Sequence, residues 1–237
     1  MQKDKLGCLI IHGFGGGIYE IKPLADYLTE NGYIVTCTKL KGHTGYGLDM
    51  KNANYKDWIT SAEEDLIELI KKTNNIVIVG FSMGGLIAIN IACKYNIKGI
   101  VTINTPIYYW NILRVLINII DDFKNKKFNN IKRYIKAKKA SPIISMLNFL
   151  LLLKITKTKL TNIECPFLIT QAKDDDTVRL KSVNHIYNNI SSKEKEIKFY
   201  EKGGHLILIS QTKDRIIIDI EIFLKKLIKK YDLSIDN

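Results

Sequence analysis

The sequence predicts an α/β protein in which helices cover both faces of a mostly parallel sheet. Short apolar runs rich in Ile and Val alternate with amphipathic helical stretches along most of the chain. The apolar runs are continuous, which is typical of strands buried on both faces of a parallel sheet. A length of 237 residues suffices for one domain with a full hydrophobic core.

The first half of the chain gives two strand–helix pairs in order. LGCLIIHG is the first strand, and IKPLADYLTENG follows as a helix with four apolar residues on one face (Ile21, Leu24, Ala25 and Leu28). Gly32 is placed to end this helix. YIVTCTKL is the second strand, and the helix DWITSAEEDLIELIKK turns five side chains inward (Trp58, Ala62, Leu66, Leu69 and Ile70).

The stretch IVIVGFSMGGLIAINIA, residues 76–92, is the next strand and helix. IKGIVTINTP, CPFLITQA and EIKFYEKGG are later strands. The chain closes on a long amphipathic helix with an apolar stripe (Ile216, Ile220, Phe223, Leu224, Leu227 and Ile228). In such sheets ligands bind beyond the carboxyl ends of the strands, so functional residues are expected there.

Residues 107–163 interrupt the alternation, because they contain helical patterns and no convincing strand. We expect a helical lid here, inserted into a core formed by residues 1–106 and 164–237, since long insertions in compact α/β domains commonly act as lids. An extra pair of core helices is the alternative. Apolar lid residues are candidates for binding substrate (Ile107, Trp110, Leu113, Phe149 and Leu150).

The net charge of +12 raises the question of nucleic-acid binding. Only four of the 36 basic residues are arginines, and the lysines are scattered along the chain, so no nucleic-acid partner is expected. The four cysteines are far apart without a CxxC pair, which predicts free thiols and no metal site. No cofactor motif, signal peptide or transmembrane segment is recognised, and a cytoplasmic protein is expected. No feature of the sequence sets an oligomeric state.

Ser82 lies in Gly80-Phe81-Ser82-Met83-Gly84, which matches G-x-S-x-G between a strand and a helix. A serine on such a sharp turn needs small neighbours, and its hydroxyl is then exposed at the strand end. No lysine follows the glycines, so a phosphate-binding P-loop is disfavoured. The turn therefore predicts a nucleophile.

A serine nucleophile needs a base and an acid that orients the base. His205 follows the last strand on a glycine-rich loop. Three aspartates, Asp174, Asp175 and Asp176, follow the strand before it, and one of them is expected to reach the histidine. HGFGGG, residues 12–17, follows the first strand and can supply the backbone N–H of Phe14 to an oxyanion hole. Met83, the residue after the serine, can supply a second N–H.

These residues resemble the α/β-hydrolase superfamily, and within it the small bacterial carboxylesterase and monoacylglycerol-lipase branch. The resemblance spans nearly the whole chain, through IIHGFGG, LKGH, DWITSAEED, VGFSMGGLIA, GIVTINTP, FLITQAKDDDTV and YEKGGHLI. It implies that Ser82 is the nucleophile, Asp175 the acid and His205 the base. Thr44 departs from the Gly-His-Gly of many relatives, which leaves the shape of that loop open.

The expected reaction is hydrolysis of carboxylic esters with small to medium acyl chains, through an acyl-enzyme and without a cofactor. The expected partner is a small hydrophobic ester, for example a monoacylglycerol, and transient contact with a lipid surface is a further expectation. The same triad would serve a thioesterase, an amidase or a C–C bond hydrolase. A receptor for a hydrophobic ligand, without catalysis, is the alternative from another class.

Overall fold

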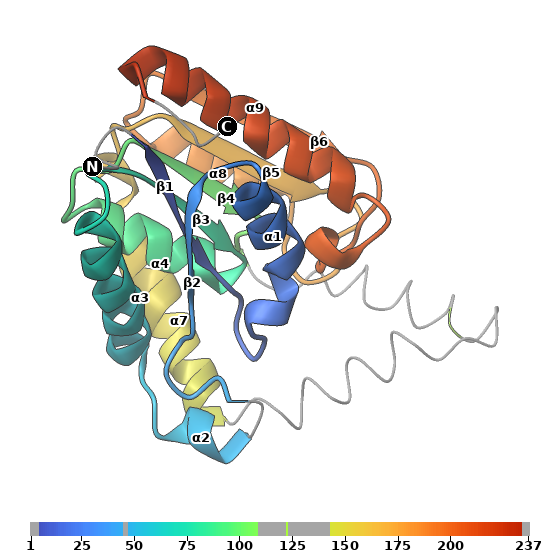
Figure 1. The fold of residues 1–237 in the computed structure, drawn as a ribbon. Coiled ribbons are helices and arrows are strands. Elements are labelled where there is room, and N and C mark those ends of the chain that lie inside the picture. The colour runs from blue at the N-terminus through green and yellow to red at the C-terminus, as the bar shows by residue number, and fades with distance from the viewer. Residues whose placement is uncertain (1–4, 45–46, 109–121, 123–142, 234–237) are drawn as a thin grey trace.

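A computed structural model of the protein describes residues 5–44, 47–108, 122 and 143–233. A six-stranded sheet of order β2-β1-β3-β4-β5-β6 forms its centre, and each neighbouring pair of strands is parallel (Figure 1). The predicted α/β architecture is therefore confirmed. The strands are β1 (Leu6–Ile11), β2 (Ile34–Thr38), β3 (Asn75–Phe81), β4 (Gly99–Ile103), β5 (Phe167–Ala172) and β6 (Lys195–Tyr200).

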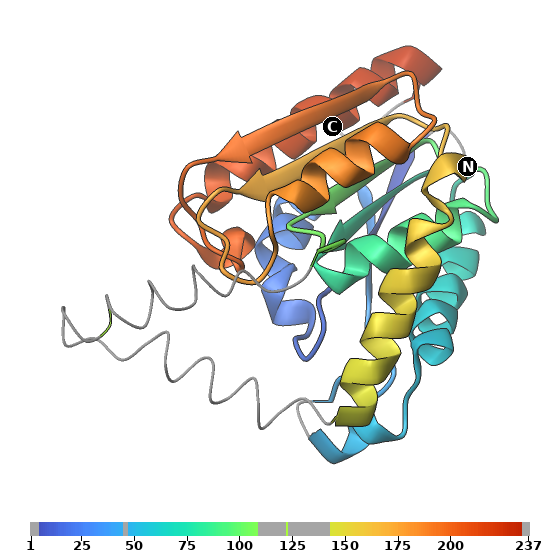
Figure 2. The same cartoon turned by 180° about the vertical axis from the view of Figure 1, so that it is seen from behind.

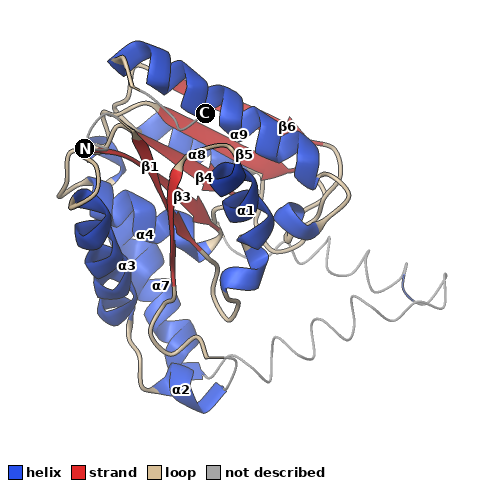
Figure 3. Cartoon of the chain, viewed as in Figure 1, coloured by secondary structure: helices blue, strands red, loops and turns tan. Residues whose placement is uncertain are grey.

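Helices cover the sheet on both faces, as Figures 2 and 3 show. One face is packed by α1 (Lys22–Glu30) and α9 (Lys213–Tyr231). The other is packed by α3 (Tyr55–Ile70), α4 (Met83–Ala92) and α8 (Lys181–Asn189). The remaining described helices are η1 (Ile18–Glu20), α2 (Gly47–Lys51), α7 (Ile143–Lys157), η2 (Leu160–Asn162) and η3 (Ile207–Ile209).

The helices bury the faces that their periodicity predicts. In α1 the buried residues are Leu24, Ala25 and Leu28, and in α3 they include Trp58 and Leu66. A reciprocal cap starts α3: Asn54 accepts from the backbone N–H of residues 56 and 57, and the Asp57 carboxylate accepts from the Asn54 N–H. Such a cap satisfies N–H groups that the first helical turn leaves free.

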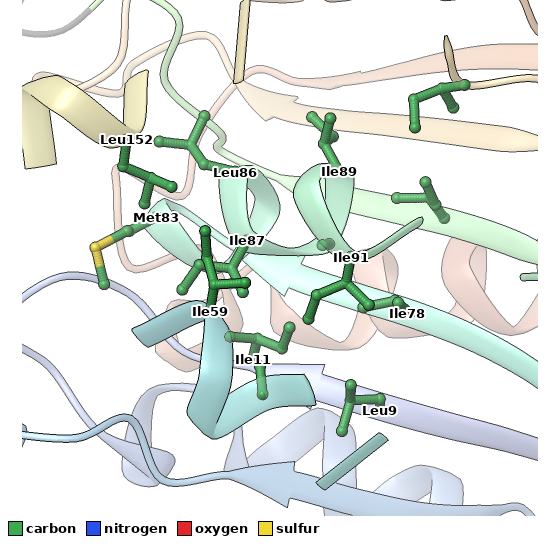
Figure 4. Close-up of a cluster of buried hydrophobic side chains, with 14 of the residues drawn as sticks. Leu9, Ile11, Ile59, Ile78, Met83, Leu86, Ile87, Ile89, Ile91 and Leu152 are labelled. Carbon is green, nitrogen blue, oxygen red and sulfur yellow. The ribbon is translucent and has the colours of Figure 1, made fainter. Parts of the chain in front are cut away.

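The largest cluster of buried apolar side chains lies between α4 and the sheet (Figure 4). Ile11 of β1 and Ile78 of β3 lie on the side of Ile87 and Ile91 of α4, and Leu152 of α7 lies beside Leu86 of the same helix. Because α4 is apolar around its circumference, it is enclosed by the sheet on one side and by α3 and α7 on the other. This enclosure fixes the start of α4, where Ser82 lies.

α7 is the described helix of the segment expected to form a lid. It packs against α4 and α3, with Asn90 of α4 donating to Thr156 Oγ1 at 2.7 Å. Ser145 Oγ donates to the Met50 carbonyl at 3.0 Å, and Asn148 Oδ1 accepts from the Tyr55 N–H at 3.3 Å. α7 thus behaves as a helix of the core over much of its length. The division into a core and a lid at residues 107–163 stays a prediction.

Candidate active site

Ser82 is held on the strained turn that joins β3 to α4. Its φ and ψ are 52° and −119°, in a region that non-glycine residues rarely adopt. The Ser82 N–H donates to the carbonyl of Ile103, the last residue of β4, at 2.8 Å. The turn is therefore tied to the neighbouring strand, and the serine is only 6% exposed.

The glycines of the motif are required by close backbone contact. A Cβ on Gly80 would lie 2.4 Å from the backbone of Gly84, inside the turn. A Cβ on Gly84 would lie 2.1 Å from the carbonyl oxygen of Ile11, at the end of β1. Real atoms do not approach so closely, so a side chain at either position would force the first turn of α4 away from the strand ends.

His205 lies next to the serine hydroxyl, on the loop after β6. Its Nε2 is 3.0 Å from Ser82 Oγ, and its Nδ1 is 2.9 Å from Asp175 Oδ2. Since a carboxylate only accepts, Nδ1 carries the proton and Nε2 is free to accept from the serine. The structure thus brings together the three side chains that the sequence singled out.

Asp175 is fixed by its own backbone neighbours. Its Oδ1 accepts from the N–H groups of Thr177 at 2.7 Å and Val178 at 3.0 Å, while Gln171 Nε2 donates to Oδ2 at 3.2 Å. The side chain is fully buried, and that of His205 is 13% exposed. Burial lowers the pKa of His205, but the Asp175 carboxylate, together with Glu20 and Asp176, outweighs burial, so the pKa lies above its ordinary value of 6.5.

The two neighbouring aspartates have other contacts. The Asp174 carboxylate accepts from the backbone N–H of Gly203 at 3.3 Å and of Gly204 at 2.8 Å, directly before His205. Asp176 Oδ1 accepts from the Thr177 hydroxyl at 3.0 Å. Asp174 therefore supports the loop that carries the histidine, a role that sequence reasoning did not assign.

Asn104 is a further residue that sequence reasoning missed. It follows β4 with a φ of 47° and is fully buried. Its Nδ2 donates to the carbonyls of Gly204 at 2.9 Å and His205 at 2.8 Å, and its Oδ1 accepts from the Ala172 N–H at 2.9 Å. One side chain thus joins the loop of the histidine to the strand end of the acid. Its position at a strand end was the only signal in the sequence.

The loop after β1 lies beside the serine. A Cβ on Gly13 would lie 3.2 Å from Ser82 Cβ, and Gly84 touches the end of β1. The two expected oxyanion donors, the N–H groups of Phe14 and Met83, therefore come from adjacent segments. The role of these N–H groups stays a prediction.

His12 holds this loop from within the core. The Leu40 N–H donates to His12 Nε2 at 3.4 Å, which leaves the proton on Nδ1, and Nδ1 donates to the Gly13 carbonyl at 2.8 Å. Burial, with the nearby His43, lowers the pKa of His12 to about 4, so the ring is neutral at neutral pH. Sequence reasoning noted His12 at a strand end but gave it no role.

The residues expected to line the substrate site have different environments. Ile107 and Phe149 are buried, and the Phe149 ring lies 5.3 Å from that of Phe14 between centroids. Leu150 is 47% exposed, on a solvent-facing part of α7. Trp110 and Leu113 lie outside the described residues. Among the described candidates, Phe149 is thus the one whose ring lies against Phe14, in the loop after β1.

Among the segments that the structure describes, no group of three or more His, Cys, Asp or Glu side chains could hold a metal ion. None of the helices in those segments is long and apolar enough to cross a bilayer.

This arrangement can be compared with known proteins. The family model for serine aminopeptidase, S33, matches residues 2–146 and 136–212. The thermostable monoacylglycerol lipase of Bacillus sp. (strain H-257) is 32% identical over 227 residues, which cover 91% of this chain and 89% of that protein. The carboxylesterase of Bacillus subtilis (strain 168) is 27% identical over 228 residues, covering 92% of each chain.

A solved structure from the metagenome-derived lipolytic enzymes LipS and LipT has the same fold. It has a TM-score of 0.79 at 22% identity and covers 94% of this chain and 95% of its own. The expected class, an ester hydrolase of the α/β-hydrolase fold, is confirmed by these relatives and the family match. The chain belongs to the serine aminopeptidase S33 family of α/β-hydrolases.

Proposed function

We propose that the protein cleaves carboxylic esters with Ser82 as nucleophile, His205 as general base and Asp175 as the acid that orients His205. One observation carries the proposal: a serine on a strained strand-to-helix turn lies 3.0 Å from an imidazole whose other nitrogen lies 2.9 Å from a buried carboxylate. Nucleophile, base and orienting group in contact are what nucleophilic acyl transfer requires.

The reaction has two halves. His205 Nε2 takes the proton of Ser82 as Oγ attacks the ester carbonyl, and the resulting imidazolium gives this proton to the departing alkoxide. An acyl-serine remains. His205 then takes a proton from water, whose oxygen attacks the acyl carbon, and returns that proton to Ser82 as the acid leaves. Asp175 stabilises the imidazolium in both halves and keeps Nδ1 protonated.

The oxyanion that forms in each half needs donors. The N–H groups of Phe14 and Met83 are proposed for this role, because both segments lie against Ser82 and the N–H groups at the start of α4 also carry the positive end of the helix dipole. The loss of one such donor typically slows catalysis by about 100-fold or more.

The proposed substrate is a small hydrophobic ester with a small to medium acyl chain, of the monoacylglycerol type. Phe14 and Phe149 place apolar surface beside the proposed oxyanion hole, and a monoacylglycerol lipase is among the curated relatives. Residues 107–163 are proposed as the lid over this site. Transient contact with a lipid surface is proposed for the exposed apolar side chains of α7 (Ile143, Ile144, Leu147, Leu150 and Leu151).

A panel of p-nitrophenyl esters of increasing acyl length tests this function. The wild type should turn over the shorter members, and Ser82→Ala should lower kcat by about 10⁴-fold or more. Ser191→Ala is the matched control, since Ser191 is exposed and its hydroxyl donates to the Thr161 carbonyl at 2.7 Å. Its activity should equal that of the wild type.

The same panel separates the alternatives. Thioester and amide analogues are offered beside the esters, and faster turnover of either would replace the ester assignment. A wild type that is inert towards every substrate, and whose Ser82 is not labelled by a fluorophosphonate, would contradict the proposal. Binding of a hydrophobic ligand by such an inert protein would identify a receptor.

A further inference from the structure

Glu20 is a buried carboxyl beside the proposed active site that the triad mechanism does not use. It ends the short helix η1, directly after the loop of residues 12–17, and is only 7% exposed. Its Oε2 accepts from the backbone N–H of Gly13 at 3.2 Å, and the backbone N–H of Gly17 helps to lower the pKa of the carboxyl. The loop therefore curls around this one side chain.

The packing of the loop around the carboxyl is tight. A Cβ on Gly16 would lie 2.0 Å from Glu20 Oε2, so a side chain at that position would displace the carboxylate from where it lies. A Cβ on Gly13 would lie 3.4 Å from Oε2 and 3.2 Å from Ser82 Cβ. Gly13 thus lies between the Glu20 carboxyl and Ser82, in contact range of both.

The contacts of Gly13 determine the orientation of the proposed oxyanion donor. Its N–H is held by Glu20, and its carbonyl accepts from His12 Nδ1 at 2.8 Å. That carbonyl and the Phe14 N–H belong to one planar peptide group. Fixing this carbonyl fixes the direction of the Phe14 N–H, so His12 orients the donor directly. Glu20 holds the preceding peptide group through the Gly13 N–H, so it anchors the loop at the residue before the donor.

The charge of Glu20 also acts on the base. Burial raises the pKa of Glu20 to about 7, and His205 and the N–H groups of Gly13 and Gly17 oppose that rise. In return, Glu20 raises the pKa of His205, together with Asp175 and Asp176. Burial and the charge of Glu20 also raise the pKa of the neighbouring Tyr19 hydroxyl. A neutral residue could accept from the loop without the cost of a buried charge.

We propose that Glu20 is a positioning residue, whose buried carboxylate orients the loop bearing the Phe14 N–H and stabilises the imidazolium of His205 through space. The proposal rests on the function proposed above. Asp175 holds one side of the imidazole by direct contact, and Glu20 adds negative charge from the segment that carries the oxyanion donor. The imidazolium and the oxyanion form in the same step, so one side chain would support both.

Glu20→Gln is the decisive variant, because it keeps the size and one accepting oxygen but removes the charge. Glu30→Gln is the matched control, since Glu30 is exposed at the end of α1 and the charge change is the same. The measurements are the pH profile of kcat/KM on a p-nitrophenyl ester and the titration of the His205 imidazole by NMR. The second measurement needs no turnover, so it separates a failure of this proposal from a failure of the ester-hydrolase assignment.

In Glu20→Gln the acid limb of kcat/KM and the His205 titration should both move to lower pH, by about half a pH unit or more, because an anion beside the imidazole is lost. We also expect kcat to fall about tenfold, with KM changing less, because the loss falls on the transition state. Glu30→Gln should match the wild type in every measurement.

Two results would overturn the proposal. One is a folded Glu20→Gln protein whose acid limb and His205 titration are those of the wild type. The other is loss of activity with an unmoved His205 titration, which would show that Glu20 only supports the loop. Glu20→Ala removes the acceptor as well and should lower kcat further. If that variant does not fold, Glu20→Gln alone decides.

Discussion

Ser82 and Asn104 both adopt positive φ angles, 52° and 47°, at the ends of the neighbouring strands β3 and β4. Such conformations cost about 1–3 kcal/mol each in a non-glycine residue. The Ser82 N–H donates to the carbonyl of Ile103, the residue before Asn104. This hydrogen bond joins the turn after β3 to the turn after β4. The backbone strain thus lies where one side chain must meet His205 and the other must hold its loop.

Substitutions in the aspartate run should separate the triad acid from the loop support. Asp175→Asn should lower kcat/KM by about 10⁴-fold, because the amide cannot keep the imidazole in the required tautomer. Asp174→Asn should cost up to about tenfold, since one oxygen can still accept from Gly203 or Gly204. Asp176→Asn should stay close to the wild type. Steady-state kinetics of the three proteins at one pH measure this order.

A different order of the three losses in kcat/KM would show how the assignment of the acid is wrong. A larger loss in Asp174→Asn than in Asp175→Asn would mean that the acid lies one residue earlier in the loop. Equal losses in all three variants would indicate a general electrostatic effect on His205 in place of one orienting contact.

At the scale of elements, the sequence predicted the helices and strands that local hydrophobic patterns encode. The apolar faces of α1, α3 and α9 follow a period of 3.6 residues, and the strands are short continuous apolar runs. The contacts of Asn104 and Glu20 leave no such pattern. Asn104 bonds to residues 68 to 101 positions away, and the burial of Glu20 depends on how a glycine loop folds over it. Only tertiary structure reveals them.

α7 shows the same limit in another form. Its sequence is apolar on all sides, so periodicity does not reveal which side is buried. The structure buries Phe149, Leu152 and Leu153 and exposes Leu147, Leu150 and Leu151. An apolar helix within a suspected lid therefore turned out to share the packing of α4.

Neighbouring residues of α7 should differ sharply in their contribution to stability. Phe149→Ala should lower the free energy of unfolding by about 3–5 kcal/mol, because Phe149 is 1% exposed and packs on Phe14. Leu150→Ala, at 47% exposure, should cost less than about 1 kcal/mol. Urea unfolding monitored by circular dichroism compares the two variants. Similar small losses would mean that α7 opens easily and acts as a mobile cover.

Across the whole molecule, the parallel sheet assembles the site from separate parts of the chain. His12, Ser82, Asn104, Asp175 and His205 follow β1, β3, β4, β5 and β6. Because every pair of these strands is parallel, their carboxyl ends meet at one edge of the sheet. The stability of the sheet and the geometry of the site are therefore linked, and a buried charge at this edge should be detectable in global unfolding.

Glu20 should make the protein less stable as pH rises from about 4.5 to about 7. Its pKa is about 7 in the folded protein against an ordinary value of 4.5, so in this range the folded state binds more protons than the unfolded state. Stability then falls with increasing pH and levels off above pH 7. A gap of this size corresponds to about 3 kcal/mol at most.

Glu20→Gln removes this dependence, and it should gain stability relative to the wild type by about 2–3 kcal/mol between pH 4.5 and pH 8. Urea unfolding of both proteins at these two pH values gives four free energies of unfolding. The gain is the change in the variant between the two pH values minus the change in the wild type. His12 titrates in the same range, since its pKa is about 4 in the folded protein against 6.5, but it does so in both proteins and its contribution cancels. If the free energies of unfolding of the two proteins changed in parallel with pH, the Glu20 carboxyl would ionise without destabilising the folded state. The charge beside His205 would then not lower the stability of the protein.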